Sequence, residues 1–286
     1  MLPVLMALCA LGIVLLWMLM PGESNAEMRA PFWGVNFAHR GLHSADGAVP
    51  ENSLAAFTAA MDEGYGIELD VRLTRDGEVV VFHDETLLRA CGRAEKLEDC
   101  TFEQLQALRL FETDQRIPLL SEVVQLVDAT VPLLIELKGG ARRKQLCQAT
   151  WRVLRRYDGD ICVQSFDPRI VRWFSRHVPG LLRGQLTAPP AALGGGIAAV
   201  LVGWGLTNAW GRPHFIASQK GKVPLLMRFA RRFAMRMVWT VGPEDDADAL
   251  EEANDAVIFE FYDPLLKYAG PLAEPEFDPA EQPPRL

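Results

Sequence analysis

Four short apolar runs of the sequence end in, or contain, ionisable side chains. These side chains are two histidines, three carboxylates and two cations: His39, Arg40, Glu68, Asp70, His83, Glu136 and Lys138. Three carboxylates form the kind of all-oxygen ligand set that binds Mg²⁺ or Ca²⁺. Two histidines beside such a cation can serve as general acid and general base of one reaction. The residue types therefore indicate acid–base chemistry next to a divalent metal.

The two cations of this set indicate which group would react. The Arg40 guanidinium is a planar fork that fits a phosphate, and the Lys138 ammonium adds a second positive charge. A metal and fixed cations together stabilise negative charge that shifts between phosphate oxygens. A histidine-based zinc site is the alternative, but the sequence has no HExxH spacing and the carboxylates outnumber the imidazoles. The remaining histidines lie outside these runs and are interpreted as structural: His43, His177 and His214.

The elements that would position these residues alternate along the chain. Eight strand-like runs lie at 35–39, 66–71, 132–138, 161–166, 181–186, 214–218, 237–241 and 256–261, with helix-like stretches at 52–64, 119–128 and 147–157 among the segments between them. In the first helix, Asn52 is the expected N-cap and Gly64 the expected stop. Alternation of this kind predicts parallel βα units. Eight units in about 250 residues match an α/β fold of the (β/α)₈ TIM-barrel class, whose site lies at the carboxyl ends of the strands.

One connection is too short for a crossover helix. Asp76-Gly77 lies between two apolar runs, which predicts a β-hairpin. A turn at about residues 75–76 would place Glu68 opposite His83. Glu68 and Asp70 share one face of their strand because strand side chains alternate.

The N-terminus carries an apolar segment. Residues 1–20 contain no charged side chain, and about 20 apolar residues can cross a bilayer as a helix. The segment lacks the basic start of a cleavable signal peptide, although Ser24-Asn25-Ala26 is an acceptable cleavage site. We therefore expect an uncleaved transmembrane anchor at 1–20, a linker at 21–34, a barrel domain at 35–270 outside the cytoplasm, and a disordered tail at 271–286.

Composition argues against one class of binding partner and against a disulfide-based fold. The net charge is −8, and the basic residues form no strong stripe, which argues against nucleic acid. Five scattered cysteines do not form a disulfide framework, although Cys91 and Cys100 could bridge a loop in an oxidising compartment; two free thiols are the alternative.

Seven fragments in order resemble the glycerophosphodiester phosphodiesterase family: AHRG, PENSLAAF, GIELDVRLTRDG, VVFHD, LIELK, SF and VWTV. The resemblance runs from about residue 36 to 261. It implies a TIM barrel of the phosphodiesterase type. It also implies a divalent metal, Mg²⁺ or Ca²⁺, and hydrolysis of glycerophosphodiesters to glycerol 3-phosphate and an alcohol.

The resemblance assigns roles position by position. His39 and His83 match the catalytic pair. Glu68, Asp70 and Glu136 match the metal ligands. Arg40 and Lys138 match the phosphate-contacting cations, and Glu51 and Asn52 match near-site residues. The chain departs from the family at Gly242, where Asn is usual, and at Ile258-Phe259-Glu260-Phe261, where a Thr-Asp pair is usual. Neither departure removes a metal or proton-transfer group, so both bear on substrate identity.

Two further stretches raise the question of whether the barrel domain itself contacts a membrane. Residues 184–211 contain no charged side chain, and this stretch is interpreted as a buried helix or apolar loop, with a lipid-facing lid as the alternative. Residues 225–237 read as an outer barrel helix with a solvated face, or as a basic amphipathic surface helix. The anchor and the apolar stretch favour one rival function, a lysophospholipase D-like activity on lysophospholipids. A rival from another class is a non-catalytic barrel that binds phosphodiesters.

Overall fold

A computed structural model describes residues 2–264 of the chain. One sheet closes on itself in the order β1-β9-β8-β7-β6-β5-β4-β2, with β1 paired to β2, and β3 extends from β2. All pairings are parallel except β2–β3. The strands are β1 (Asn36–Ala38), β2 (Gly66–Leu73), β3 (Val79–Val81), β4 (Leu133–Leu137), β5 (Ile161–Ser165), β6 (Leu182–Thr187), β7 (Phe215–Gln219), β8 (Met235–Val241) and β9 (Ala256–Phe259). The eight parallel strands confirm the predicted (β/α)₈ barrel.

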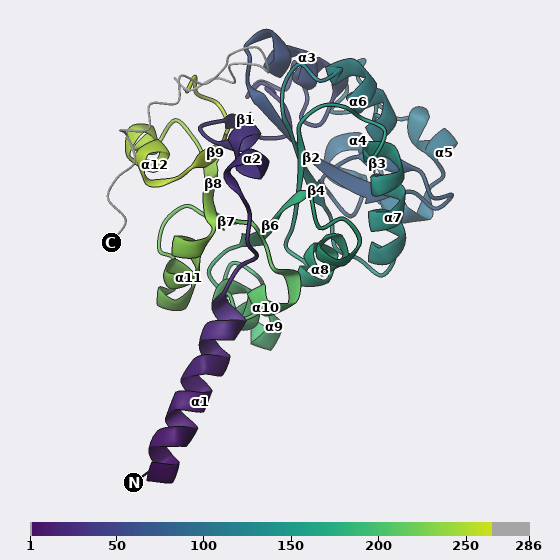
Figure 1. Ribbon diagram of the computed structural model, residues 1–286. Coiled ribbons are helices and arrows are strands. Elements are labelled where there is room, and N and C mark those ends of the chain that lie inside the picture. The colour runs from purple at the N-terminus through teal and green to yellow at the C-terminus, as the bar shows by residue number, and fades with distance from the viewer. Residues whose placement is uncertain (1, 265–286) are drawn as a thin grey trace.

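Helices surround the barrel, and the first one projects away from it (Figure 1). The α-helices are α1 (Leu2–Leu19), α2 (Ala26–Arg29), α3 (Leu54–Asp62), α4 (Leu88–Cys91), α5 (Phe102–Gln106), α6 (Leu120–Val127), α7 (Arg143–Leu154), α8 (Pro168–His177), α9 (Gly196–Gly203), α10 (Asn208–Gly211), α11 (Leu225–Ala230) and α12 (Ala247–Ala253). Three 3₁₀ turns complete the list: η1 (Ala30–Phe32), η2 (Leu97–Asp99) and η3 (Arg231–Phe233). The tail at 271–286 and the end of the predicted barrel domain at 265–270 lie outside the described residues.

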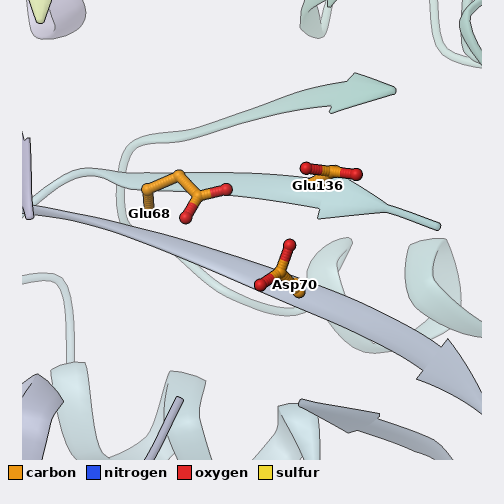
Figure 2. A group of neighbouring side chains, drawn as sticks. All are labelled: Glu68, Asp70 and Glu136. Atoms are coloured by element: carbon orange, nitrogen blue, oxygen red, sulfur yellow. The ribbon is translucent and has the colours of Figure 1, made fainter. Parts of the chain in front are cut away.

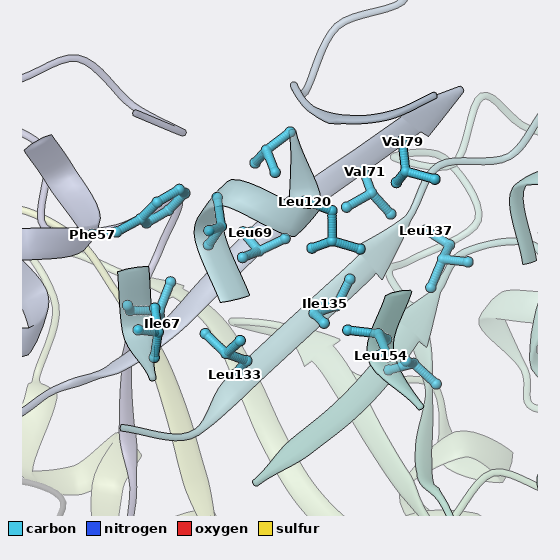
Figure 3. Close-up of a cluster of buried hydrophobic side chains, with 14 of the residues drawn as sticks. Phe57, Ile67, Leu69, Val71, Val79, Leu120, Leu133, Ile135, Leu137 and Leu154 are labelled. Atoms are coloured by element: carbon cyan, nitrogen blue, oxygen red, sulfur yellow. The ribbon is translucent and has the colours of Figure 1, made fainter. Parts of the chain in front are cut away.

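Strand β2 shows how the sequence separates core from site. Ile67, Leu69 and Val71 point outward and pack against the surrounding helices, in a cluster that includes Phe57 of α3 and Leu120 of α6 (Figure 3). Because strand side chains alternate between faces, Glu68 and Asp70 must then point into the barrel. Burial of the apolar outer face therefore fixes the orientation of the two carboxylates.

The hairpin is present, but its predicted register is wrong. Val71 pairs with Val81, so residue 83 faces residue 69 and His83 is not opposite Glu68. The loop closes with the Thr74 N–H donating to the Glu78 carbonyl. The turn therefore spans three residues, with Gly77 at a φ of +93°, a conformation that glycine adopts without strain. The extra turn residue shifts the pairing by one.

Two helix boundaries also differ from the prediction. The N-cap of α3 is Ser53, whose hydroxyl accepts from the Ala56 N–H, and not Asn52. Asn52 has a φ of +55° and turns its side chain into the barrel. The stretch 225–237 is not one helix, because η3 ends it and β8 begins at Met235. Met237 therefore belongs to the barrel core.

The N-terminal segment is attached to the barrel at two places. Leu19, at the end of α1, is buried against Ile216, Met227 and Ala230. Phe32 in η1 packs into the core cluster that contains Phe37 and Phe215. Residues 2–14 of α1, in contrast, are exposed, and α1 is the one helix among residues 2–264 that is long and apolar enough to cross a membrane. Each cysteine is free, so Cys91 and Cys100 form no disulfide.

The barrel interior gives a test of this packing. A Cβ added at Gly184 in β6 would lie 1.9 Å from Cε2 of the buried Phe215 ring, so the ring must move. Overpacking of this kind destabilises a core by about 1–3 kcal/mol. We expect G184A to lower the free energy of unfolding by that amount, measured by urea denaturation in one detergent. Gly180, which is exposed and has open space around it, supplies the matched control G180A. Equal stability of both variants would contradict this account of the core.

Candidate active site

Three carboxylates meet at the carboxyl end of the barrel, as the sequence predicts. Glu68 and Asp70 come from β2 and Glu136 from β4, and one oxygen of each lies within 4.8 Å of the others. The register explains the meeting, because Asp70 and Glu136 are direct partners in the β2–β4 pairing. Figure 2 shows the three carboxylates directed toward one another from the two strands. All three residues are buried.

Cations compensate only part of this buried negative charge. Lys138 Nζ lies 2.7 Å from Asp70 Oδ1 and 2.7 Å from Glu136 Oε1, and Arg40 Nε lies 3.4 Å from Asp70 Oδ2. Burial alone would raise the pKa of Asp70, but Lys138 and Arg40 outweigh it and hold this pKa far below its ordinary value. Among residues 2–264, no cation forms an ion pair with Glu68. Burial and the charges of Asp70 and Glu136 raise its pKa well above the ordinary range.

This cluster fits a divalent cation. Its donors are carboxylate oxygens from rigid, adjacent strands, which is the chemistry that Mg²⁺ and Ca²⁺ require. Burial, together with the charges of Asp70 and Glu136, raises the pKa of Glu68, so a further positive charge would favour its ionised form. A cation held by Glu68, Asp70 and Glu136 would supply the missing positive charge.

His39 lies at the end of β1 beside a carboxylate that the sequence analysis did not assign to the site. Its Nδ1 is 2.9 Å from Glu260 Oε2, just past the end of β9. Burial lowers the pKa of His39, and the bond to Glu260 acts in the opposite direction. The pairing of Ala38 with Phe259 brings the two side chains together. Glu260 therefore orients the ring through Nδ1.

His83 has an equivalent arrangement on the other side of the cluster. Its Nδ1 is 2.6 Å from Asp84 Oδ1, and Asp84 in turn accepts from Nε of Arg89 at 2.7 Å. Burial lowers the pKa of His83 to about 4, although the charge of Asp70 raises it. The charge of Asp70 also acts on His39. Both rings therefore lie within electrostatic range of the same carboxylate.

Glu51 and Asn52, the two residues expected near the site, form hydrogen bonds to its charged side chains. Glu51 Oε1 accepts from Arg40 Nη1 at 2.8 Å and from Arg89 Nη2 at 2.7 Å, which joins the surroundings of the two histidines. Asn52 Nδ2 donates to Asp70 Oδ2 at 2.8 Å. Arg40 and Asn52 both have a φ of +55°, in the left-handed region that asparagine tolerates and arginine adopts rarely.

One more side chain of the barrel interior faces the cluster. Gln164 on β5 is buried and donates from Nε2 to Glu68 Oε1 at 3.4 Å. Its Oε1 is buried without a hydrogen-bond partner. The run ICVQSF contains the signal for this residue, because Gln164 alternates with outward-facing Val163 and is aligned with Glu136.

The other histidines and Gly242 lie outside the carboxylate cluster. His43 packs edge-on against Phe261 at 4.9 Å between ring centroids and lies 6.5 Å from the His39 ring, so it borders the site. His177 stacks on Trp173, and His214 is buried just before β7. The Gly242 N–H donates to Asp245 Oδ2 in the loop after β8.

Comparison with known proteins gives a consistent result. Residues 39–263 match the model of the glycerophosphoryl diester phosphodiesterase family. The Bacillus subtilis protein YhdW is 35% identical over 53% of this chain and 65% of its own length. A glycerophosphodiester phosphodiesterase of Caldanaerobacter subterraneus is 43% identical over 36% of this chain and 44% of its own length. The aligned stretches thus span less than two thirds of these relatives.

Solved structures support the same fold. A phosphodiesterase of Oleispira antarctica, solved with the product sn-glycerol-3-phosphate, superposes with a TM-score of 0.64 at 23% identity, covering 79% of this chain and 93% of that one. A glycerophosphodiester phosphodiesterase of Thermotoga maritima gives a TM-score of 0.59 at 25% identity, covering 79% and 94%.

The contact between His39 and Glu260 can be tested in solution. Because the Glu260 carboxylate raises the pKa of His39 against the effect of burial, E260Q should lower that pKa further. An NMR titration of the imidazole resonances measures it. His83, whose partner is Asp84, is the internal control and should titrate as in the unmodified protein. A His39 pKa that does not move would mean that Glu260 does not hold the ring.

Proposed function

Because the chain belongs to the glycerophosphoryl diester phosphodiesterase family, we propose that it hydrolyses glycerophosphodiesters to glycerol 3-phosphate and an alcohol. The observation that carries the proposal is the buried cluster of Glu68, Asp70 and Glu136 with two histidines in electrostatic range of Asp70. Burying such a cluster destabilises the fold, because each buried charge loses several kcal/mol of hydration. This cost indicates that the cluster has a function.

The proposed cofactor is one divalent cation, Mg²⁺ or Ca²⁺, held by Glu68, Asp70 and Glu136. When bound, it supplies positive charge that stabilises the phosphate oxygens as negative charge develops on them. Arg40 and Lys138 are the proposed phosphate contacts. Their side chains are 15% and 11% exposed at the edge of the cluster, so both keep a solvent-accessible part.

His39 and His83 are the proposed acid–base pair. The lowered pKa values of both rings keep them neutral near pH 7, so each can accept a proton. In each ring, Nδ1 is directed to a carboxylate, and Nε2 remains for the substrate. One ring, unprotonated at Nε2, removes a proton from the nucleophile, either water or a glycerol hydroxyl. The other ring first takes up a proton at Nε2 from solvent and then gives that proton to the leaving alkoxide. Glu260 and Asp84 stabilise whichever imidazolium forms.

We further propose that α1 remains attached as a membrane anchor, with the barrel outside the cytoplasm. Cleavage after Ala26 would remove Leu19 from its buried contacts with Ile216 and Met227 and would leave an apolar surface exposed. The helix is about 27 Å long at 1.5 Å per residue, close to the roughly 30 Å of a bilayer's hydrocarbon core.

A second candidate substrate class is the lysophospholipids, which keep one acyl chain. The observation that favours it is a cleft of about 600 Å³ beside the end of β4. Its lining includes Gly139 and Gly140, which follow Lys138, together with the charged Asp167 and Arg169 and several apolar side chains, among them Leu193, Leu201 and Val202. An acyl chain could lie in this cleft while the phosphate contacts Lys138.

Turnover separates catalysis from simple binding. H39A and H83A should each lower kcat for glycerophosphocholine by roughly 10²–10⁴-fold, the usual contribution of an acid–base group. The assay is glycerol 3-phosphate release in excess Mg²⁺ or Ca²⁺. The matched control is H177A, since His177 lies exposed on α8 and should leave kcat unchanged. Substantial residual activity of H39A would remove that residue from the pair. If the unmodified chain binds the metal but turns over neither glycerophosphocholine nor a lysophospholipid, the barrel is a binding module.

Metal affinity tests the carboxylate cluster independently of turnover. D70N should weaken Ca²⁺ or Mg²⁺ binding at least tenfold, because it removes a charged oxygen ligand from the cluster. Isothermal titration calorimetry after chelation measures it. E103Q, which changes an exposed glutamate on α5, is the control for the loss of one negative charge. Equal affinity of D70N and the unmodified protein would exclude Asp70 as a ligand.

A further inference from the structure

Exposed apolar side chains gather on the side of the barrel from which α1 departs. We name these residues the tryptophan face: Trp17, Ile197, Trp204, Trp210 and Leu225, with exposed fractions of 56%, 81%, 43%, 55% and 70%. They lie on α1, α9 and α11 and in and beside α10, and these elements are neighbours at the base of α1 in Figure 1. A soluble surface seldom groups so many large apolar side chains without a partner.

The tryptophan face is held in a fixed relation to α1. Asn208 Nδ2 in α10 donates to the Leu19 carbonyl at 2.9 Å, and Arg212 Nη1 donates to the Met20 carbonyl at 2.8 Å. The Gly22 N–H bonds to the Pro213 carbonyl at 2.8 Å. A bilayer that contains α1 would therefore meet this face of the barrel at the end of the helix.

Two of the tryptophans are paired with arginines. The Arg212 guanidinium lies 5.1 Å from the Trp17 ring centroid, and Arg172 lies 5.5 Å from that of Trp210. Tryptophan is enriched at the level of lipid headgroups, where its ring is apolar and its N–H is wet. A neighbouring arginine adds a cation at the depth of the lipid phosphates.

The charge of this part of the chain differs from that of the rest. Residues 184–243 contain seven lysines and arginines and no aspartate or glutamate, although the whole chain has 37 acidic residues and a net charge of −8. This segment includes α9, α10, α11 and η3. Within this segment, Lys220 and Arg236 are already paired with carboxylates that lie outside it. Arg212, which bonds to the end of α1, can meet an anionic headgroup there.

From these observations we propose that the tryptophan face docks on the interfacial region of a phospholipid bilayer, as a second membrane contact beside α1. Trp204, Trp210 and Ile197 enter the boundary between headgroups and acyl chains, and the arginines meet lipid phosphates. The proposal rests on α1 being a retained membrane helix, and it does not depend on the catalytic residues.

Docking has a consequence for access to the site. Trp210 is on the tryptophan face and also lines the cleft that reaches Gly139 and Gly140 beside Lys138. The cleft therefore connects the docking surface with the carboxyl end of β4. A substrate embedded in the bilayer could reach the site along this cleft without first entering bulk water.

Tryptophan quenching by brominated lipids tests the proposal. The full chain is reconstituted in vesicles of phosphatidylcholine and phosphatidylglycerol, with and without bromine at carbons 6 and 7 of one acyl chain. The chain has seven tryptophans. If Trp17, Trp204 and Trp210 all reach the lipid, W204F/W210F should lower the quenched share of the fluorescence by about half. W151F, which removes a tryptophan of α7 on another side of the barrel, should raise that share slightly.

An increase in the quenched share of the fluorescence for W204F/W210F would overturn the proposal. If only α1 contacts lipid, W204F/W210F removes two unquenched tryptophans, and the quenched share rises as it does for W151F. Absence of any quenching would overturn the premise that α1 enters the bilayer. The single variants W204F and W210F repeat the comparison if the double variant does not fold. Release of glycerol 3-phosphate from soluble glycerophosphocholine should stay unchanged in W204F and W151F, whose side chains do not line the cleft. Failure of this release in the unmodified chain would count against the proposed function alone.

Discussion

The structure depends on one constraint, the burial of three carboxylates inside a closed barrel. Glu68, Asp70 and Glu136 are each less than a tenth exposed, and buried charges are tolerated only when they are paired or coordinated. The surrounding polar groups follow from this need. Lys138 contacts two of the carboxylates, and Asn52 and Gln164 donate to Asp70 and Glu68. Even so, Glu68 keeps a raised pKa, which is the electrostatic condition that a bound cation would relieve.

Closure of the sheet provides the second half of the site. The first and last strands of the barrel are adjacent only because the sheet closes, and their register sets His39 against Glu260. His83 arrives by a different route, from the antiparallel hairpin that extends β2. Each imidazole is held through Nδ1 by an acidic neighbour, so both present the same nitrogen to a substrate. The two catalytic candidates thus have similar surroundings although they belong to unrelated elements.

The segment next to α1 differs from the barrel interior because it contains no carboxylates. Carboxylates are concentrated elsewhere, and residues 184–243 have none. The same segment provides α10, which bonds to the end of α1, and the wall of the cleft beside β4. The carboxyl end of β4, the apolar cleft and α1 are therefore linked through one stretch of chain.

The sequence by itself determined the barrel and most of the site, because alternation on strands such as GIELDV fixes which side chains face inward, and because strand ends converge on one side of a barrel. The start of α3 and the register of the hairpin depend on details that the local pattern does not show. Asn52 donates a hydrogen bond to Asp70, so Ser53 is the N-cap of α3, and Gly77 permits a three-residue turn. Glu260 stands out in the sequence only as a departure from the family pattern, and the alternation of ICVQSF indicates that Gln164 faces inward without indicating what it contacts. Both join the carboxylates and His39 through barrel closure and strand register, which act over separations of up to 221 residues along the chain.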